Sequence, residues 1–189
     1  APSGTGNYNL TDLGNAKRLV RQSISDLRFS SKRDQWLYYN GQRWVLDPKS
    51  VIVTRHAKQT ISSIFAEANA QTTKRDREAL LAHAYRSESV KSIRAMVTLA
   101  STEPEFEIEG ERLDHDPCLF NMQNGTMDLS TGELLPHDRE DFITKISPVI
   151  YDQKATCPVW DEFISYSFND NADNISFFYR YFGYCLTGL

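Results

Sequence analysis

Residues 113–137, LDHDPCLFNMQNGTMDLSTGELLPH, hold the densest turn chemistry of the chain and decide how its middle folds. Residues 119–122 form a short apolar run, and residues 126–129 alternate polar and apolar side chains. Between them, the dipeptide Asn124-Gly125 accepts the positive φ values of a tight hairpin turn, and residues 130–132 turn the chain again. The stretch therefore predicts a small β-meander in which Asn, Asp and Gly mainly serve backbone geometry.

The residues before this stretch predict helices around one β-hairpin. Residues 35–47 give the hairpin signal, because two aromatic and apolar runs flank the dipeptide Asn40-Gly41. Trp36 and Trp44 in these runs are typical of core and cross-strand packing, although such side chains also stack on nucleic-acid bases. Helical spacing of apolar residues predicts a first helix that begins near Thr11 or Asp12. It also predicts three later helices, over residues 49–70, 74–86 and 87–100.

The spacing also predicts which faces of the helices are buried. In the first helix, Leu13, Ala16 and Val20 form the predicted core face, and Lys17, Arg18 and Arg21 the solvent face. In the helix over residues 87–100, the predicted buried stripe is Val90, Ile93, Val97 and Ala100.

An acidic segment connects these helices to the meander. Glutamates occupy every odd position of residues 103–111, and Phe106 and Ile108 lie between them. Period two predicts an edge strand whose glutamate face discourages pairing with other chains. After the meander, residues 142–151 predict two more short strands, interrupted at Pro148.

The last part of the chain predicts a helical hairpin with a well-packed aromatic interior. Apolar and aromatic residues recur at helical spacing from Cys157-Pro158 to residue 168 and again over residues 175–186, with a break at residues 169–171. Three cysteines, Cys118, Cys157 and Cys185, lie far apart and never as C-x-x-C, so neither a disulfide framework nor a zinc site is indicated. We expect them to be buried small apolar residues.

These patterns predict an α+β fold that is mostly helical, with short antiparallel hairpins, a small meander and a terminal helical hairpin. The predicted parts are a flexible leader (1–9), a basic helical subdomain (10–102) with the hairpin at about 35–47, the meander (103–152) and the helical hairpin (153–189). With 40% hydrophobic residues the chain can bury a core. It shows no signal peptide and no apolar run of about 20 residues, so we expect a soluble intracellular protein without membrane contact.

Charge is distributed unevenly along the chain. Residues 1–99 hold 16 Lys and Arg against 8 Asp and Glu, a net of +8, whereas residues 100–189 hold 5 against 17, a net of −12. Local cations neutralise phosphates whatever the overall pI, so the first half is the predicted DNA-binding surface, although a merely solvated face is an equal alternative. Its candidate residues are Arg28, Lys32, Arg33, Arg43, Arg55, Lys58, Lys74, Arg75 and Arg77.

One cluster suggests catalysis. Asp114 and Asp116 form a D-x-D pair, the arrangement by which nucleotidyl transferases hold magnesium, and His115 and His137 are possible further ligands. The context argues against a metal site, because such a pair needs a rigid apolar strand beneath it, whereas Pro117 follows at once. The sequence also has no G-x-x-x-x-G-K-[ST] loop and no G-x-S-x-G elbow, so we predict no catalytic residue.

Several separated motifs resemble one known family. The meander is spelled L-D-x-D-P-x-L-x-N-x-x-N-G-x-x-D-L-x-T-G-x-L-x-P-H. It follows T-D-x-G-N-A at residues 11–16 and W-x-x-Y-x-G-x-R-W-x-x-D at residues 36–47, and precedes C-P-x-W-x-x-F at residues 157–163 and G-Y-x-L-T-G at residues 183–188. In this order, over about residues 10–188, the motifs resemble the domain that precedes the superfamily 3 helicase motor in phage, plasmid and poxvirus primase-helicases.

The resemblance implies a non-catalytic accessory domain of a replicative primase-helicase, which binds or positions DNA, single-stranded or forked, and couples primase to the ring ATPase. It implies neighbouring primase and helicase domains, a hexamer of the full-length protein, and action in the cytoplasm of a host cell. In the family the phosphate-binding loop comes shortly after L-T-G, so ATP and Mg are expected on a helicase domain beyond residue 189 and no cofactor on this fragment. The alternatives are an interaction or oligomerisation module that does not touch DNA and a metal-dependent nuclease or nucleotidyl transferase using Asp114, His115 and Asp116.

Overall fold

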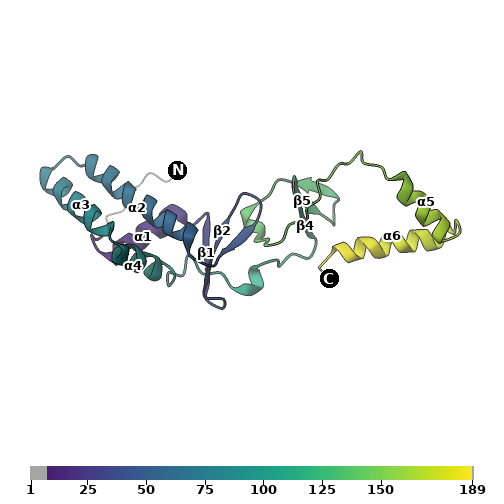
Figure 1. The fold of residues 1–189 in the computed structure, drawn as a ribbon, viewed down its shortest axis with the longest axis horizontal. Helices are drawn as coiled ribbons and strands as arrows, with labels where there is room; N and C mark the ends of the chain where they lie inside the picture. Colours follow the sequence, from purple (N-terminus) through teal and green to yellow (C-terminus); the bar gives the residue numbers. More distant parts are fainter. Residues whose placement is uncertain (1–7, 189) are drawn as a thin grey trace. The chain divides into compact units, whose positions relative to one another are not determined.

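The computed structural model describes residues 8–188, so most of the predicted leader 1–9 lies outside the described residues. The chain divides into two compact units (Figure 1). We call residues 8–40 and 44–113 the helical unit, and residues 41–43 and 114–188 the meander unit. The predicted α+β class is confirmed, because six helices accompany two small antiparallel sheets within the described part of the chain.

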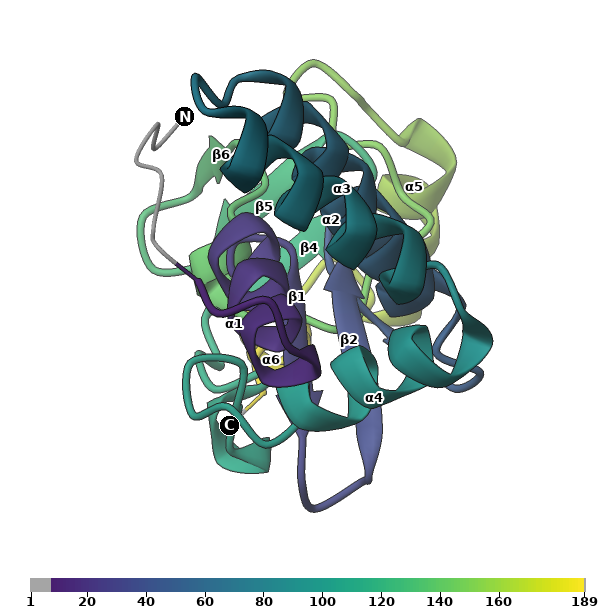
Figure 2. The ribbon, with the colours of Figure 1, turned by 90° about the vertical axis from the view of Figure 1, so that its left-hand side faces the viewer.

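The helical unit contains α1 (Asp12–Ser23), β1 (Leu27–Ser30), β2 (Gln35–Tyr39), β3 (Trp44–Asp47), α2 (Val51–Asn69), α3 (Lys74–Ser87), α4 (Val90–Ala100) and the 3₁₀ turn η1 (Gly110–Arg112). Its strands form an antiparallel sheet in the order β1-β2-β3. Figure 2 shows α2 beside α3 and α1 beside α4, and these pairs are in direct contact. One apolar core joins the sheet to α1, α2 and α4, and a smaller cluster joins α2 to α3.

The first helix begins as the sequence predicts, but its faces differ from the prediction. Thr11 caps α1, since its hydroxyl accepts a hydrogen bond from the backbone N–H of Gly14 at 3.1 Å. A Cβ at Gly14 would lie 1.9 Å from the carbonyl oxygen of Asn9, so only glycine fits there. Leu13 is 47% exposed, whereas Arg18 is buried and forms an ion pair with Glu67 of α2. The partner carboxylate on another helix overrides the local periodicity.

The fourth helix also differs from its predicted buried stripe. Met96 and Ala100 are fully buried, whereas Val90 is 65% exposed. Ile93 and Val97 are only partly buried. The stripe is therefore rotated toward Met96, and one side of α4 keeps branched apolar side chains in contact with solvent.

The predicted strand over residues 103–111 is wrong as a strand, although its alternation is right. Phe106 and Ile108 are buried, and Glu107 between them is exposed. Instead of a ladder, a single parallel bridge joins Glu107 to Phe29 of β1, with Phe29 N–H donating to Phe106 O at 2.7 Å and Ile108 N–H donating to Phe29 O at 2.9 Å. The segment then enters η1, so the apolar side chains are held by the core instead of by strand pairing.

The meander unit contains β4 (Leu119–Met122), β5 (Gly125–Asp128), β6 (Glu133–Leu135), the 3₁₀ turn η2 (Arg139–Asp141), α5 (Pro158–Ser167) and α6 (Ala172–Leu186). The predicted meander is present, in the order β4-β5-β6. Its first turn is shifted by one residue, because Met122 pairs with Gly125 and the loop is Gln123–Asn124. Gly125 has φ +154°, and a Cβ there would meet Leu135 O at 2.5 Å.

Side-chain amides hold the segment that follows the meander, where the two further predicted strands are absent from the described residues. Asn121 donates through Nδ2 to Lys145 O at 3.0 Å, and Gln123 donates through Nε2 to Ser147 O at 3.0 Å. Asn124 both donates to Tyr151 O and accepts from Tyr151 N–H, each at 2.9 Å. The two asparagines of the N-x-x-N-G motif thus bind main chain, as their predicted structural role requires.

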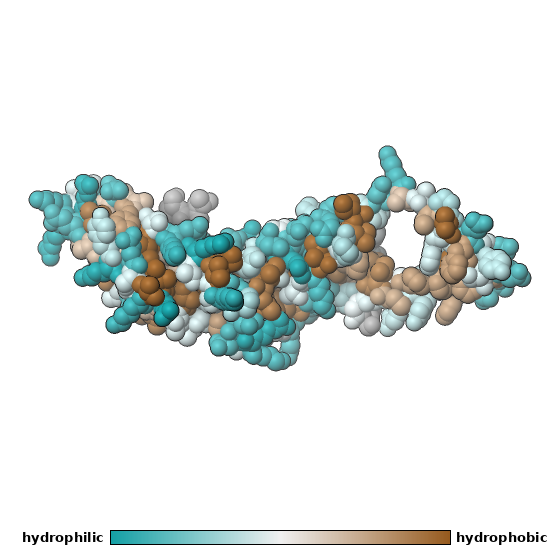
Figure 3. Space-filling view, in the orientation of Figure 1, coloured by the Kyte–Doolittle hydropathy of each residue, from teal (hydrophilic) through white to brown (hydrophobic). Residues whose placement is uncertain are grey.

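The terminal hairpin is present but less covered than predicted. Trp160 of α5 lies near Phe178 and Phe182 of α6, with ring centroids 6.3 Å and 5.9 Å apart. Of its large side chains Ile164 is buried, while many aromatic side chains remain exposed, and Figure 3 shows apolar surface on both helices.

The cysteine prediction is wrong: Cys157 and Cys185 are exposed, Cys118 is half-buried, and all three are free thiols. No helix among residues 8–188 is both long and apolar enough to cross a bilayer.

Candidate functional site

The nine cations predicted to bind DNA fall into two groups in the structure. Arg28 is half-buried, donates to Leu27 O at 2.8 Å and lies over the Trp44 ring at 5.3 Å. Arg43 is half-buried and donates to Thr144 O at 2.8 Å. These two guanidinium groups therefore hold main chain. The other seven are exposed: Lys32, Arg33, Arg55, Lys58, Lys74, Arg75 and Arg77.

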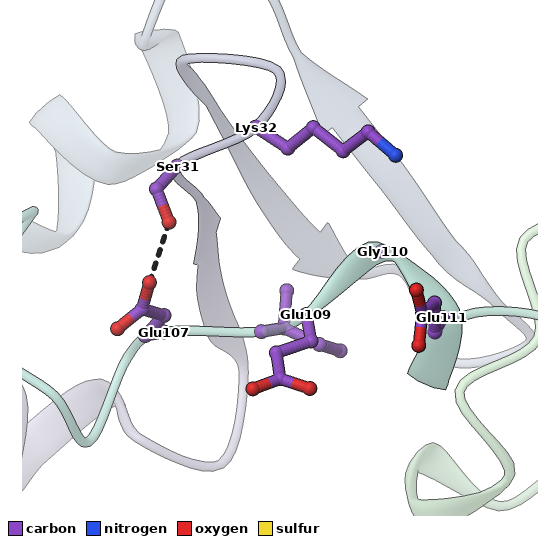
Figure 4. A pocket seen from close by; sticks show the side chains of 7 residues that line it. Ser31, Lys32, Glu107, Glu109, Gly110 and Glu111 are labelled. Carbon is purple, nitrogen blue, oxygen red and sulfur yellow. Dashed lines mark hydrogen bonds between the residues drawn. The ribbon is translucent and has the colours of Figure 1, made fainter.

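The exposed cations are not equivalent. Lys32 stands beside a small hollow of about 240 Å³ lined by three glutamates, and Figure 4 shows its side chain above Gly110, with Ser31 bonded to Glu107. These carboxylates make Lys32 a poor ligand for phosphate. Lys74, at the start of α3, forms an exposed ion pair with Glu78 at 3.8 Å, which is weak at such exposure.

A groove between α2 and α4 brings other cations together. It has a volume of about 470 Å³ and is lined by Lys49, Ser50, Thr54, Lys58, Val90, Ile93, Arg94, Val97 and Thr98. Its three cations, Lys49, Lys58 and Arg94, are exposed, and no carboxylate lines it. Positive charge without a neighbouring negative charge attracts a phosphate backbone.

Sequence reasoning found only Lys58 of these three cations. Lys49 precedes α2 and Arg94 lies in the middle of α4, so they are 45 positions apart and no local pattern links them. A signal for Arg94 was nevertheless present in the sequence. Its helix has more apolar residues than one core face requires, and Arg94 directly follows one of them, Ile93. The contact between α2 and α4 turns separate surface charges into one site.

The N-terminus of α2 adds little to this site, because its own chain occupies it. Asp47 accepts hydrogen bonds from the N–H groups of Val51 and Ile52, each at 2.8 Å, and of Val53 at 3.1 Å. These are the donors that would otherwise bind an anion at a helix N-terminus. A phosphate in this groove would therefore be bound by side chains.

Both carboxylates of the D-x-D pair accept hydrogen bonds from backbone N–H groups. Asp114 accepts from the N–H of Thr144 at 2.7 Å and from its hydroxyl at 2.5 Å. Asp116 accepts from Cys118 N–H at 2.8 Å, which closes a turn. Within residues 8–188 no group of three His, Cys, Asp or Glu side chains could hold a metal ion. His115 is exposed, and His137 Nε2 lies 3.4 Å from Gln123 O.

Two aspartates of the meander unit show how local structure shifts a pKa. Hydrogen bonds from the hydroxyl and N–H of Ser130 lower the pKa of Asp128, as expected for a turn carboxylate. Burial raises the pKa of Asp141, and the negative charges of Asp138 and Asp116 raise it further.

A buried polar network joins α1 to α3. Asn15 donates through Nδ2 to Ser87 Oγ at 2.9 Å, and its Oδ1 lies 2.8 Å from His83 Nε2. Ser87 in turn donates to His83 O at 2.9 Å. All three residues are buried, so the Asn15 of the T-D-x-G-N-A motif is a structural residue.

We expect the helical unit to lose stability as the pH falls below 6.5. Burial lowers the pKa of His83, the charges of Arg86 and Arg18 lower it further, and Asp12 opposes them. The unfolded chain therefore takes up the proton first, so the free energy of unfolding falls from pH 6.5 down to the folded-state pKa. Burial also lowers the pKa of His56, although the negative charge of Asp26 opposes this shift. His56 therefore adds to the loss of stability at low pH.

Urea unfolding between pH 8 and about pH 5 measures this dependence. The variant His83→Gln keeps a hydrogen-bonding side chain but cannot titrate, so it should show a shallower pH dependence. A wild-type slope that His83→Gln leaves unchanged would show that this imidazole is not the titrating group.

Comparison of the sequence with models of protein families matches residues 16–168 to the family described as D5 N terminal like. The match covers most of the chain, including the groove between α2 and α4, the whole meander and the whole of α5. A search of curated proteins finds no match to the sequence.

Proposed function

Because the chain belongs to the D5 N-terminal-like family, the N-terminal domains of D5-like primase-helicases, we propose that it is a non-catalytic domain that binds and positions DNA. In the parent protein it couples primase to a ring ATPase during replication. Beside it in the parent protein lies a superfamily 3 motor, which uses ATP and Mg and assembles as a hexamer on a phage or plasmid replicon.

The observation that supports DNA binding is the groove between α2 and α4. Lys49 just before α2, Lys58 of α2 and Arg94 of α4 all line it, and none of its lining residues is acidic. The protein as a whole is acidic, with a formal net charge of −4, and would repel a polyanion. A polyanion would therefore bind where cations are concentrated locally, as they are in this groove.

We expect the double variant Lys58→Glu/Arg94→Glu to bind DNA about 10- to 100-fold more weakly than the wild-type chain. It replaces two attractive charges by two repulsive ones, and it should reduce the salt dependence of binding by about one unit of slope for each phosphate that is no longer neutralised. Fluorescence anisotropy with a labelled oligonucleotide, repeated over a series of salt concentrations, measures both quantities.

The control is Lys154→Glu/Arg180→Glu, which makes the same change of net charge at exposed positions of the meander unit. It should bind almost as well as the wild type. A third variant, Lys74→Glu/Arg75→Glu/Arg77→Glu, tests the start of α3. If that variant loses affinity and the groove variant does not, DNA binds at α3; if no variant changes affinity or salt slope, the basic face does not bind DNA.

A second function, an interaction module, is supported by the terminal hairpin. Phe163, Phe177, Tyr181 and Tyr184 of α5 and α6 are each more than half exposed, and aromatic side chains are enriched at protein interfaces. Gel-shift assays with single-stranded and duplex DNA separate the two functions, because a module without DNA contact shifts neither probe. Both functions are compatible in one chain, since the groove and the hairpin belong to different units.

A further inference from the structure

The groove between α2 and α4 is lined by two rows of side chains, one from each side. Ser50, Thr54 and Lys58 follow one another at four-residue spacing along α2, so they form one line on that helix. Along α4 the lining residues recur every three or four positions from Val90 to Thr98, which forms a second line. The groove is the space between these two lines.

The lining of the groove combines apolar side chains, which we call its floor, with cationic side chains. Val90 is 65% exposed, and Ile93 and Val97 are only partly covered by the core. Lys49, Lys58 and Arg94 are exposed, and none of them takes part in an ion pair within the described residues. A complementary ligand therefore carries negative charges beside an exposed apolar face.

Single-stranded nucleic acid has this combination, whereas a duplex does not. A duplex keeps the flat faces of its bases stacked and offers mainly phosphates to a shallow groove. A single strand exposes the base faces beside the phosphates. The volume of about 470 Å³ also lies at the scale of a small-ligand pocket, which suits one nucleotide better than a helix of DNA.

We propose that this groove binds single-stranded DNA, with Lys49, Lys58 and Arg94 on the phosphates and one base against Val90, Ile93 and Val97. This assignment rests on the proposed function and adds the form of DNA that is recognised. Aliphatic side chains contact any base face, and the Thr54 hydroxyl already donates to Ser50 O at 2.5 Å. Binding is therefore expected to depend little on sequence.

Three probes of equal length test the assignment: a single strand, a hairpin-closed duplex, and a single strand with abasic sites. The duplex keeps the charge but hides the base faces, and the abasic strand keeps the charge but lacks bases. We expect the single strand to bind about 3- to 10-fold more tightly than either, the size of effect that burial of part of one base gives.

The variant Val90→Ser locates the effect at the groove floor. Val90 lies in the first turn of α4 and is 65% exposed, so the change leaves the core intact. It should weaken the single strand about threefold and leave the abasic strand unchanged. The matched control is Val159→Ser, in the first turn of α5, where Val159 is 79% exposed. It should alter none of the three affinities.

The outcomes separate this inference from the proposed function. If the duplex or the abasic strand binds as tightly as the single strand, or if Val90→Ser changes nothing, the groove floor does not take a base, although DNA binding stands. If no probe binds, both proposals are overturned, and an acidic protein segment becomes the fitting occupant.

Discussion

Trp36→Ala is expected to destabilise the helical unit by about 3–5 kcal/mol, the cost of removing a large aromatic side chain from a close-packed core. Trp36 is 3% exposed. Its ring lies 5.2 Å from that of Phe29 at 62° and 5.2 Å from that of Phe106 at 81°. The side chain thus connects β1, β2 and the segment after α4, and alanine would leave a cavity between all three.

Urea unfolding followed by tryptophan fluorescence measures this loss. A Trp160→Phe background removes the signal of the meander unit, so that fluorescence then reports on the helical unit through Trp44. Tyr166→Ala is the control, because Tyr166 is 87% exposed and should change the free energy of unfolding by less than about 0.5 kcal/mol. A Trp36→Phe variant that kept full stability but bound DNA more weakly would instead support stacking of Trp36 on bases.

The second large effect is expected at Asp47, whose carboxylate serves three backbone N–H groups at the start of α2. The N-cap residue of this helix, Ser50, has φ 51° and makes no side-chain capping bond. Asp47, the last residue of β3, makes the capping bonds instead, and its side chain is buried. Asp47→Ala would leave three N–H groups without an acceptor and is expected to cost about 2–4 kcal/mol.

A graded series checks this assignment by the same unfolding assay. Asp47→Asn keeps one acceptor oxygen but loses the negative charge that a helix N-terminus favours, so it should cost less than Asp47→Ala. Glu105→Ala removes one negative charge from an exposed position of the same unit and should be nearly neutral. Equal effects of all three changes would show that the carboxylate does not hold α2.

Local chemistry explains the parts of the fold that the sequence predicts correctly. Helix starts such as Thr11 are decided by bonds within a few residues, and so is the hairpin around Asn40-Gly41. The meander is predicted for the same reason, and its one-residue shift arises from a distant contact. Leu135 O approaches the backbone at Gly125 so closely that glycine is needed in the strand rather than in the turn.

The incorrect predictions concern residues whose environment comes from elsewhere in the chain. Arg18 looks like a surface residue in its own helix, but Glu67 meets it from α2. The alternation of residues 103–111 reports correctly which side chains are buried, yet it cannot say whether a neighbouring strand is available for pairing. The exposure of Cys157 and Cys185 likewise depends on what covers α5 and α6. The spacing of the cysteines in the sequence does not encode this.

For this protein, the sequence by itself determined the α+β class, the family, and the basic character of the first half, because turn residues, periodicity and charge are local properties. The tertiary structure decided which of those charges line the same groove. It committed Arg28 and Arg43 to main-chain carbonyls and brought Arg94 and Lys58 into the lining of one groove. A site of this kind exists only where two helices pack, since neither helix alone has both the floor and the opposing cations.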